Sequence, residues 1–191
     1  MSSRRSRVQV PSAPPKFNLT TVISLFRDGK VVMACDGQMT LGDTVFKKTT
    51  KKIRRIFNGN VLVGFAGSTA DAMALLERFE RKLQEFGGNI TRASVELAKE
   101  WRMDKALRQL SAMLLVADKQ NILVISGNGD VIVPDDNVAA IGSGGPIALA
   151  VAKALLKHSN LPPEEIAKEA VKLSGEISIY SNENIYVEVL E

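Results

Sequence analysis

The chain has 191 residues, of which 45% are hydrophobic and 24% charged, a composition typical of one globular domain with a substantial core. Its net charge of +4 arises in the first 19 residues, so residues 20–191 carry 21 basic and 21 acidic side chains. The balanced charge argues against a nucleic-acid partner, the single cysteine excludes an internal disulfide, and no apolar run approaches the roughly 20 residues of a membrane-spanning helix.

The first 19 residues differ in kind from the rest of the chain. They hold three of the seven prolines, four basic residues and no acidic residue, so we expect them to be disordered. An acid-free stretch rich in Arg and Ser also resembles an organellar transit peptide, but the prolines oppose an amphipathic helix there. From Thr20 the sequence changes to a β-branched pattern, which predicts a domain boundary at residue 19 or 20.

Two hairpins are predicted at the start of the domain. Asp28-Gly29 and Asn58-Gly59 are dipeptides typical of hairpin turns that need positive φ, and each lies between apolar, β-branched runs. The four predicted strands cover residues 20–26, 30–35, 52–56 and 61–66. We expect these strands to belong to one antiparallel sheet.

Two helices are predicted next. Apolar residues recur at helical spacing from Ala72 to Phe86, Ser68 or Thr69 can cap the start, and Gly87-Gly88 can end the helix. A second helix begins at Thr91 and carries an apolar face that includes Trp101. We expect both helices to cover one sheet.

The remaining pattern is a second set of strands followed by two more helices. Short apolar runs predict strands at residues 113–117, 121–126, 131–133 and 138–141. A helical pattern follows at 146–156 and 163–174, and a final strand is predicted at 184–190. Each of these helices has proline in its first turn, where the missing N–H costs nothing. This order of elements predicts an α+β fold or a four-layer αββα sandwich, in which two antiparallel sheets pack together with a helix layer outside each.

The inventory of reactive side chains excludes several kinds of catalytic site. The only histidine, His158, lies near a predicted helix end and is expected to be exposed, so a Ser-His-Asp or Cys-His centre is improbable. Cys35 lies in an apolar run typical of a buried thiol, which fits a reducing cytoplasm. A zinc site of the Cys and His type lacks ligands, and no GxxxxGK[ST] phosphate loop is present. Gly142–Gly145 could hold an anion, but such turns are common.

An N-terminal threonine would supply both nucleophile and base without histidine. Its hydroxyl is the nucleophile, and its own α-amine, with a reference pKa of about 7.7–8.0, can accept the hydroxyl proton at neutral pH. A nearby lysine would favour the neutral amine, and a carboxylate would hold that lysine in place.

Seven sequence segments in consecutive order resemble the HslV family, the peptidase subunits of bacterial ATP-dependent proteases, which are related to proteasome β subunits. The segments are Thr20–Ser24, Cys35–Gly42, Lys51–Arg55, Gly64–Ala72, Val95–Arg102, Ile125–Asp130 and Ala140–Pro146. The resemblance covers essentially all of residues 20–191. It implies a single proteasome-like peptidase domain with the four-layer N-terminal-nucleophile hydrolase fold, a threonine-type endopeptidase.

The resemblance implies a role for each of five residues. Thr20 would be the nucleophile and supply the amine base, Lys52 would tune that amine, and Asp36 would orient Lys52. The backbone N–H of Gly67 would stabilise the oxyanion, and Ser143 would help relay the proton. Each residue also has an ordinary structural interpretation: a turn for Asp36, a surface charge for Lys52, helix packing for Gly67 and a helix cap for Ser143.

The resemblance also implies a cofactor and partners. Family members bind sodium through backbone carbonyls, and the matching positions are Gly175, Ser178 and Ser181. Glu176 stands where relatives usually carry aspartate, so no role is carried over to it. The implied assembly is a homododecamer of two stacked hexamers, capped by an AAA+ ATPase, HslU, that unfolds and delivers protein substrates, and nothing in this chain is expected to bind ATP.

The residues before Thr20 are the main departure from the family. An α-amine can act as base only if Thr20 is the first residue, so the chain as written is expected to be inactive. We hypothesise that translation begins at Leu19, read as methionine, and that this methionine is then removed. Two rival functions stay open: a catalytically silent ring subunit, and a monomeric or dimeric amidohydrolase that acts on a small amide.

Overall fold

The structure is a computed structural model that describes residues 20–41, 43–105, 107, 110–126 and 129–191. The extension predicted for residues 1–19 lies outside the described residues. Within the described ranges no helix is both long enough and apolar enough to span a membrane.

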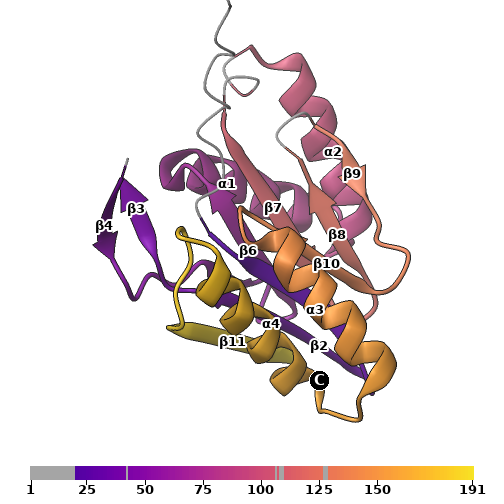
Figure 1. The fold of residues 1–191 in the computed structure, drawn as a ribbon. Helices are drawn as coiled ribbons and strands as arrows, with labels where there is room; N and C mark the ends of the chain where they lie inside the picture. Colours follow the sequence, from indigo (N-terminus) through magenta and orange to yellow (C-terminus); the bar gives the residue numbers. More distant parts are fainter. Residues whose placement is uncertain (1–19, 42, 106, 108–109, 127–128) are drawn as a thin grey trace, which may run out of the picture.

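A four-stranded antiparallel sheet contains both ends of the described chain (Figure 1). Its order is β10-β1-β2-β11, with strands β1 (Val22–Arg27), β2 (Lys30–Asp36), β10 (Val138–Ile141) and β11 (Ile185–Leu190). Asp28 and Gly29 join β1 to β2 with φ of 54° and 77°, the left-handed conformation that the predicted hairpin turn requires. Strand β1 therefore lies inside the sheet, between the hairpin partner β2 and the distant β10.

A five-stranded antiparallel sheet forms the other half of the molecule. Its strands follow chain order: β5 (Ile53–Ile56), β6 (Val61–Gly67), β7 (Ala112–Ala117), β8 (Ile122–Ile125) and β9 (Val131–Ile132). Asn58 and Gly59, with φ of 54° and 85°, turn β5 into β6 as the sequence predicted. The prediction that the first four strands belong to one sheet was wrong. The first hairpin and the second hairpin lie in different sheets, because β1 pairs with β10 and β2 with β11.

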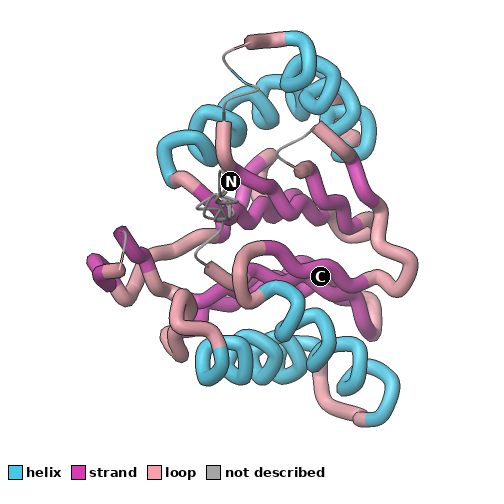
Figure 2. The backbone as a smooth tube through the Cα atoms, turned by 45° about the horizontal axis from the view of Figure 1, so that its top comes forward, coloured by secondary structure: helices cyan, strands magenta, loops and turns pink. Residues whose placement is uncertain are grey.

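The two sheets face each other, and a pair of helices covers the outer face of each (Figure 2). Helices α1 (Thr69–Glu85) and α2 (Ile90–Met103) pack on the five-stranded sheet, and α3 (Gly145–His158) and α4 (Pro163–Ile177) pack on the four-stranded sheet. The predicted four-layer αββα sandwich is confirmed. His158 is exposed at the end of α3, as expected.

Helix ends follow the capping pattern in the sequence. Ser68 accepts a hydrogen bond from the Asp71 N–H at the start of α1, and Asn89 caps α2 through the Arg92 N–H. Prolines begin α3 and α4 in their first turns, where an N–H would have no intrahelical partner. These local signals explain why the predicted helices match the structure to within a few residues.

Three apolar clusters fill the spaces between the four layers. One, with Phe79 and Trp101, lies between α1, α2 and the five-stranded sheet. Another, with Ile23 and Ile166, lies between α3, α4 and the four-stranded sheet. The third lies between the sheets and contains Cys35, whose thiol is fully buried as predicted. Burial of each large apolar side chain contributes about 1.5–3 kcal/mol, so the contact between the sheets is held largely by these side chains.

A small hairpin that the sequence analysis did not predict extends from the body of the molecule (Figure 1). It consists of β3 (Met39–Leu41) and β4 (Thr44–Lys47). Leu41 and Phe46 are 70% and 72% exposed, so the hairpin offers an apolar surface with no covering element in the described chain. Its strands are too short and too exposed to give the alternating apolar pattern on which strand prediction depends.

Candidate active site

Five chain segments meet where the strands of the two sheets end. Thr20 lies two residues before β1, Asp36 ends β2, and Ser143 lies in the turn after β10, so all three adjoin strands of the four-stranded sheet. Lys52 directly precedes β5 and Gly67 ends β6, both in the five-stranded sheet. The five residues singled out in the sequence are thus drawn from both sheets.

Thr20, Lys52 and Asp36 are in direct contact. The Thr20 hydroxyl donates a 2.7 Å hydrogen bond to Asp36 Oδ1, and Lys52 Nζ donates to Thr20 Oγ1 and, over 2.8 Å, to the same Asp36 oxygen. Their exposed fractions are 2%, 5% and 0%. The arrangement places an ammonium group and a carboxylate together on one threonine hydroxyl, away from bulk water.

The Asp36 carboxylate is fixed by its surroundings. Oδ1 also accepts a 2.8 Å hydrogen bond from the Thr21 N–H, and Oδ2 accepts one of 2.8 Å from the Gln38 N–H. A buried carboxylate needs such donors, because an unpaired one would lose its hydration without compensation. The backbone around Asp36 thereby orients the oxygen that holds Lys52.

Burial lowers the pKa of Lys52 from its ordinary value of 10.5, and the adjacent Asp36 carboxylate opposes that shift. The ion pair with Asp36 is thus the contact that favours the charged form of Lys52 beside Thr20.

A glycine-rich turn encloses the backbone of Thr20. The Thr20 nitrogen donates to Ser143 Oγ over 3.3 Å, the Ser143 hydroxyl donates to the Thr20 carbonyl over 3.4 Å, and the Gly144 N–H donates to that carbonyl over 3.3 Å. Gly142 has φ of 92°, and a Cβ there would lie 2.1 Å from the Thr20 carbonyl oxygen. Glycine is required at this position, since both the conformation and the space exclude a side chain.

A pocket of about 470 Å³ opens beside Thr20. Among the described residues its walls combine apolar side chains and hydroxyls with one amide and one ammonium group: Gln38, Met39, Thr40, Leu41, Thr50, Lys52, Phe65, Ala66, Gly67, Ser68, Thr69 and Ser111. Gly67 lies in this wall with φ of 110°. The pocket has the size and the mainly apolar lining of a ligand site. The oxyanion role of Gly67 stays a prediction.

Sequence reasoning missed a buried group of hydroxyls behind Thr20. Thr21 Oγ1 lies 2.8 Å from Ser174 Oγ and 2.7 Å from Ser181 Oγ, and Ser174 donates to the Gly144 carbonyl over 3.0 Å. These hydroxyls link the residue after the nucleophile to α4 and to the glycine-rich turn. Ser181 was expected only as a carbonyl ligand of sodium, and the hydroxyl contacts join distant segments with no shared spacing, so the sequence carries no signal for them.

The residues predicted to bind sodium lie together where α4 ends. Gly175 is in the last turn of α4, and Ser178 and Ser181 follow in the next loop. The Ser178 carbonyl accepts from the Ser181 N–H over 3.1 Å, while among the described residues no hydrogen bond reaches the carbonyls of Gly175 and Ser181. Free carbonyls at a helix C-terminus favour a cation, so the residues fit a carbonyl-bound ion.

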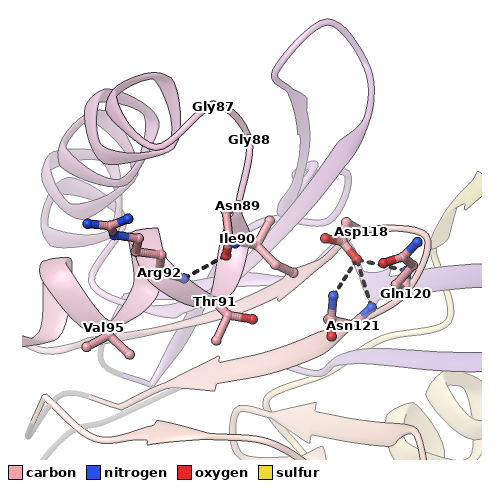
Figure 3. A pocket seen from close by; sticks show the side chains of 10 residues that line it. All are labelled: Gly87, Gly88, Asn89, Ile90, Thr91, Arg92, Val95, Asp118, Gln120 and Asn121. Carbon is pink, nitrogen blue, oxygen red and sulfur yellow. Dashed lines mark hydrogen bonds between the residues drawn. The ribbon is translucent and has the colours of Figure 1, made fainter.

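Another pocket, of about 600 Å³, lies between the start of α2 and the turn from β7 to β8 (Figure 3). Its polar groups are occupied by one another: Asn89 Oδ1 accepts from Arg92, and Asp118 Oδ1 accepts from Gln120 and Asn121. It contains none of the residues in contact with Thr20. The candidate site is therefore the pocket beside Thr20.

Comparisons with known proteins identify the family. The profile described as "Proteasome subunit" matches residues 17–190. The "ATP-dependent protease subunit HslV" of Petrotoga mobilis is 57% identical over 175 residues, which cover 92% of this chain and 99% of the relative. The protein of the same name from Pseudothermotoga lettingae is 58% identical over 88% of this chain and 96% of the relative. The chain belongs to the HslV family. The crystal structure of HslV from Trypanosoma brucei is similar with a TM-score of 0.87 and 48% identity, over 90% of this chain and 99% of that one.

Membership of the HslV family shows the general function of this chain and its enzymatic class. The chain is a proteolytic subunit and a peptidase of the threonine type. Among the described segments, Thr20 precedes β1 and contacts both Lys52 and Asp36, which agrees with that class. The roles of individual residues, the ion and the partners go beyond this membership.

Proposed function

We propose that, in a form beginning at Thr20, this chain is the threonine endopeptidase subunit of an ATP-dependent protease. One observation carries the proposal: a buried threonine hydroxyl in contact with both members of a Lys52–Asp36 ion pair, beside a pocket of about 470 Å³. The hydroxyl would be the nucleophile, and the free α-amine of the same residue would be the base.

The proposed reaction has two steps. The Thr20 hydroxyl gives its proton to the α-amine as Oγ1 attacks the substrate carbonyl carbon, and the oxyanion that forms accepts a hydrogen bond from the Gly67 N–H. Collapse of this intermediate breaks the peptide C–N bond, the amine of the leaving peptide takes the proton, and an ester on Oγ1 remains. Water then attacks the ester under the same base and releases Thr20 and the acid product. An oxyanion contact of this kind contributes about 3–4 kcal/mol to the lowering of the barrier.

The neighbouring residues support the base. The Lys52 ammonium would disfavour protonation of the α-amine, and Asp36 would hold Lys52 against Thr20. Ser143, whose hydroxyl lies 3.3 Å from the Thr20 nitrogen, would relay the proton between the amine and the leaving group. Sodium held by the carbonyls of Gly175, Ser178 and Ser181 would supply a fixed positive charge at the end of α4.

The proposed assembly is a cytoplasmic homododecamer of two hexameric rings, served by an AAA+ ATPase of the HslU type that delivers unfolded protein. The relatives' name, "ATP-dependent protease subunit", supports an ATPase partner, since this chain contains no phosphate-binding loop of the GxxxxGK[ST] type. The exposed apolar residues of the β3–β4 hairpin support contacts with other subunits. Native mass spectrometry tests the dodecamer directly, and a monomer would favour the small-amide hydrolase instead.

Covalent labelling tests the nucleophile. A protein that begins at Thr20 should react with a tripeptide vinyl sulfone, and peptide mapping should place the adduct on Thr20. The same protein with Thr20→Ala should remain unlabelled, as should the full chain that retains residues 1–19. Labelling at another residue, or equal labelling of the chain with an acylated Thr20 nitrogen, would refute the proposed base.

We further propose that the native gene product starts at Leu19, read as methionine, and is trimmed to Thr20. Intact-mass measurement of protein made from the native gene tests this start. A working enzyme that retains residues 1–19 would contradict it.

A further inference from the structure

The loop after α4 reaches the two segments that carry the ion pair. The Asn182 side chain accepts a 3.1 Å hydrogen bond from the Gly37 N–H, next to Asp36, and donates one of 3.1 Å to the Lys48 carbonyl, in the segment that leads to Lys52. A single carboxamide thus uses its acceptor on one segment and its donor on the other. No sequence pattern pointed to this residue.

The junction that Asn182 joins is tightly packed. A Cβ at Gly37 would lie 2.4 Å from the Lys48 carbonyl oxygen, so only glycine lets the two backbones approach this closely. The Thr50 N–H donates to the Gly37 carbonyl over 2.8 Å, which continues the contact toward Lys52. Small shifts of Asn182 would therefore move both segments relative to each other.

A second contact ties the same loop to the other side of Asp36. Gln38 donates its N–H to Asp36 Oδ2 over 2.8 Å and its side-chain Nε2 to the Ile179 carbonyl over 2.9 Å. The loop after α4 therefore holds the Asp36–Gln38 turn at Gly37 and at Gln38. Asn182 Oδ1 is itself oriented by the Asn184 N–H over 3.1 Å.

The geometry points to Asn182 as a positioning residue for the Lys52–Asp36 pair. It acts through Gly37 and Lys48, touches no reacting atom, and fixes the distance from Lys52 to Thr20. Because misplacement by about 1 Å can cost up to about 100-fold in rate, its loss slows the reaction more than it weakens substrate binding. The inference rests on the proposed function of Thr20.

The test compares vinyl sulfone labelling of Thr20 in three proteins that begin at Thr20: the parent, Asn182→Ala, and the matched control Asn184→Ala. Asn184 lies in the same loop and is exposed, and within the described chain its side chain makes no hydrogen bond, while its backbone N–H still reaches Asn182. We expect Asn182→Ala to lower the maximal labelling rate constant at least about tenfold, with the inhibitor constant KI within about twofold, and Asn184→Ala to leave both unchanged.

The outcomes separate the two proposals. A parent protein that is not labelled refutes the proposed function, whereas a labelled parent with an equally fast Asn182→Ala variant refutes the positioning role alone. A change in KI without a change in the maximal rate constant also refutes it. If Asn182→Ala does not fold, Asn182→Asp decides, since it keeps an acceptor for the Gly37 N–H and puts a charged carboxylate oxygen in place of the donor to the Lys48 carbonyl: a slower maximal rate supports the role and an unchanged rate overturns it.

Discussion

The buried Lys52–Asp36 pair gives a quantitative test of how the site is held together. Substitution Asp36→Asn leaves Lys52 buried without its counter-charge, and Lys52→Met leaves the Asp36 carboxylate with Thr20, Thr21 and Gln38 as its donors. Removal of one partner of a buried ion pair costs about 3–5 kcal/mol, whereas replacement of both by uncharged groups of similar volume is often neutral.

Proton release sets a ceiling on the cost of Asp36→Asn. The unpaired Lys52 can become neutral, and to remove a proton at pH 7 from a group with the ordinary lysine pKa of 10.5 costs about 5 kcal/mol. We therefore expect a loss of about 3–5 kcal/mol for Asp36→Asn, and a smaller loss for Lys52→Met, because the carboxylate keeps three donors. The double variant should be more stable than the sum of the two losses predicts, by at least about 1 kcal/mol.

Urea unfolding of the three variants at one protein concentration measures these free energies. Asp135→Asn is the control, because Asp135 is exposed and has no recorded partner in the described structure, and it should change stability by less than about 0.5 kcal/mol. Additive losses in the double variant would show that the two side chains do not act as a pair, and would refute the reasoning.

Three further predictions concern single residues. Gly142→Ala should slow labelling of Thr20 by about 100-fold, because the new Cβ would displace the Thr20 carbonyl; a normal rate would contradict the close approach. The pKa of Lys52 is lowered in the folded state, so between that lowered pKa and 10.5 the unfolded state binds more protons than the folded state. The free energy of unfolding should therefore rise with pH across this window. Urea titrations at several pH values should show the rise, and Lys52→Met should flatten it. Burial raises the pKa of the Cys35 thiol to about 11, so iodoacetamide should modify it only after denaturation, and mass spectrometry of the native protein should show no adduct.

Local chemistry made most of the elements predictable. The Asp28-Gly29 and Asn58-Gly59 turns adopt the positive φ that their residue types favour, and the helices begin at the expected caps and prolines. The pairing of strands was less accessible, since the placement of β10 beside β1 and of β11 beside β2 depends on packing between segments far apart in the chain. The β3–β4 hairpin gave no apolar alternation at all.

In the candidate site, too, some residues could be predicted from the sequence, whereas the contacts between distant segments could not. Thr20, Lys52 and Asp36 follow from the family resemblance, since Asp36-Gly37 alone is an ordinary turn and Lys52 one of several basic residues. Their contact is visible only in the fold. The hydroxyl contacts of Ser174 and Ser181 with Thr21, and the contact of Asn182 with Gly37, could not be found from sequence, because a polar side chain that bonds a distant segment leaves no local pattern.

The nucleophile and the proposed oxyanion donor belong to different sheets, which share no strand pairing in the described structure and pack through an apolar cluster in the middle of the molecule. A sideways slip of one layer over the other would separate Thr20 from Gly67 without breaking a single strand pairing. The alignment of the reacting groups is therefore a property of the interior as a whole. Methyl groups such as those of Leu62 and Leu115, remote from any substrate, set the tolerance within which peptide cleavage can occur.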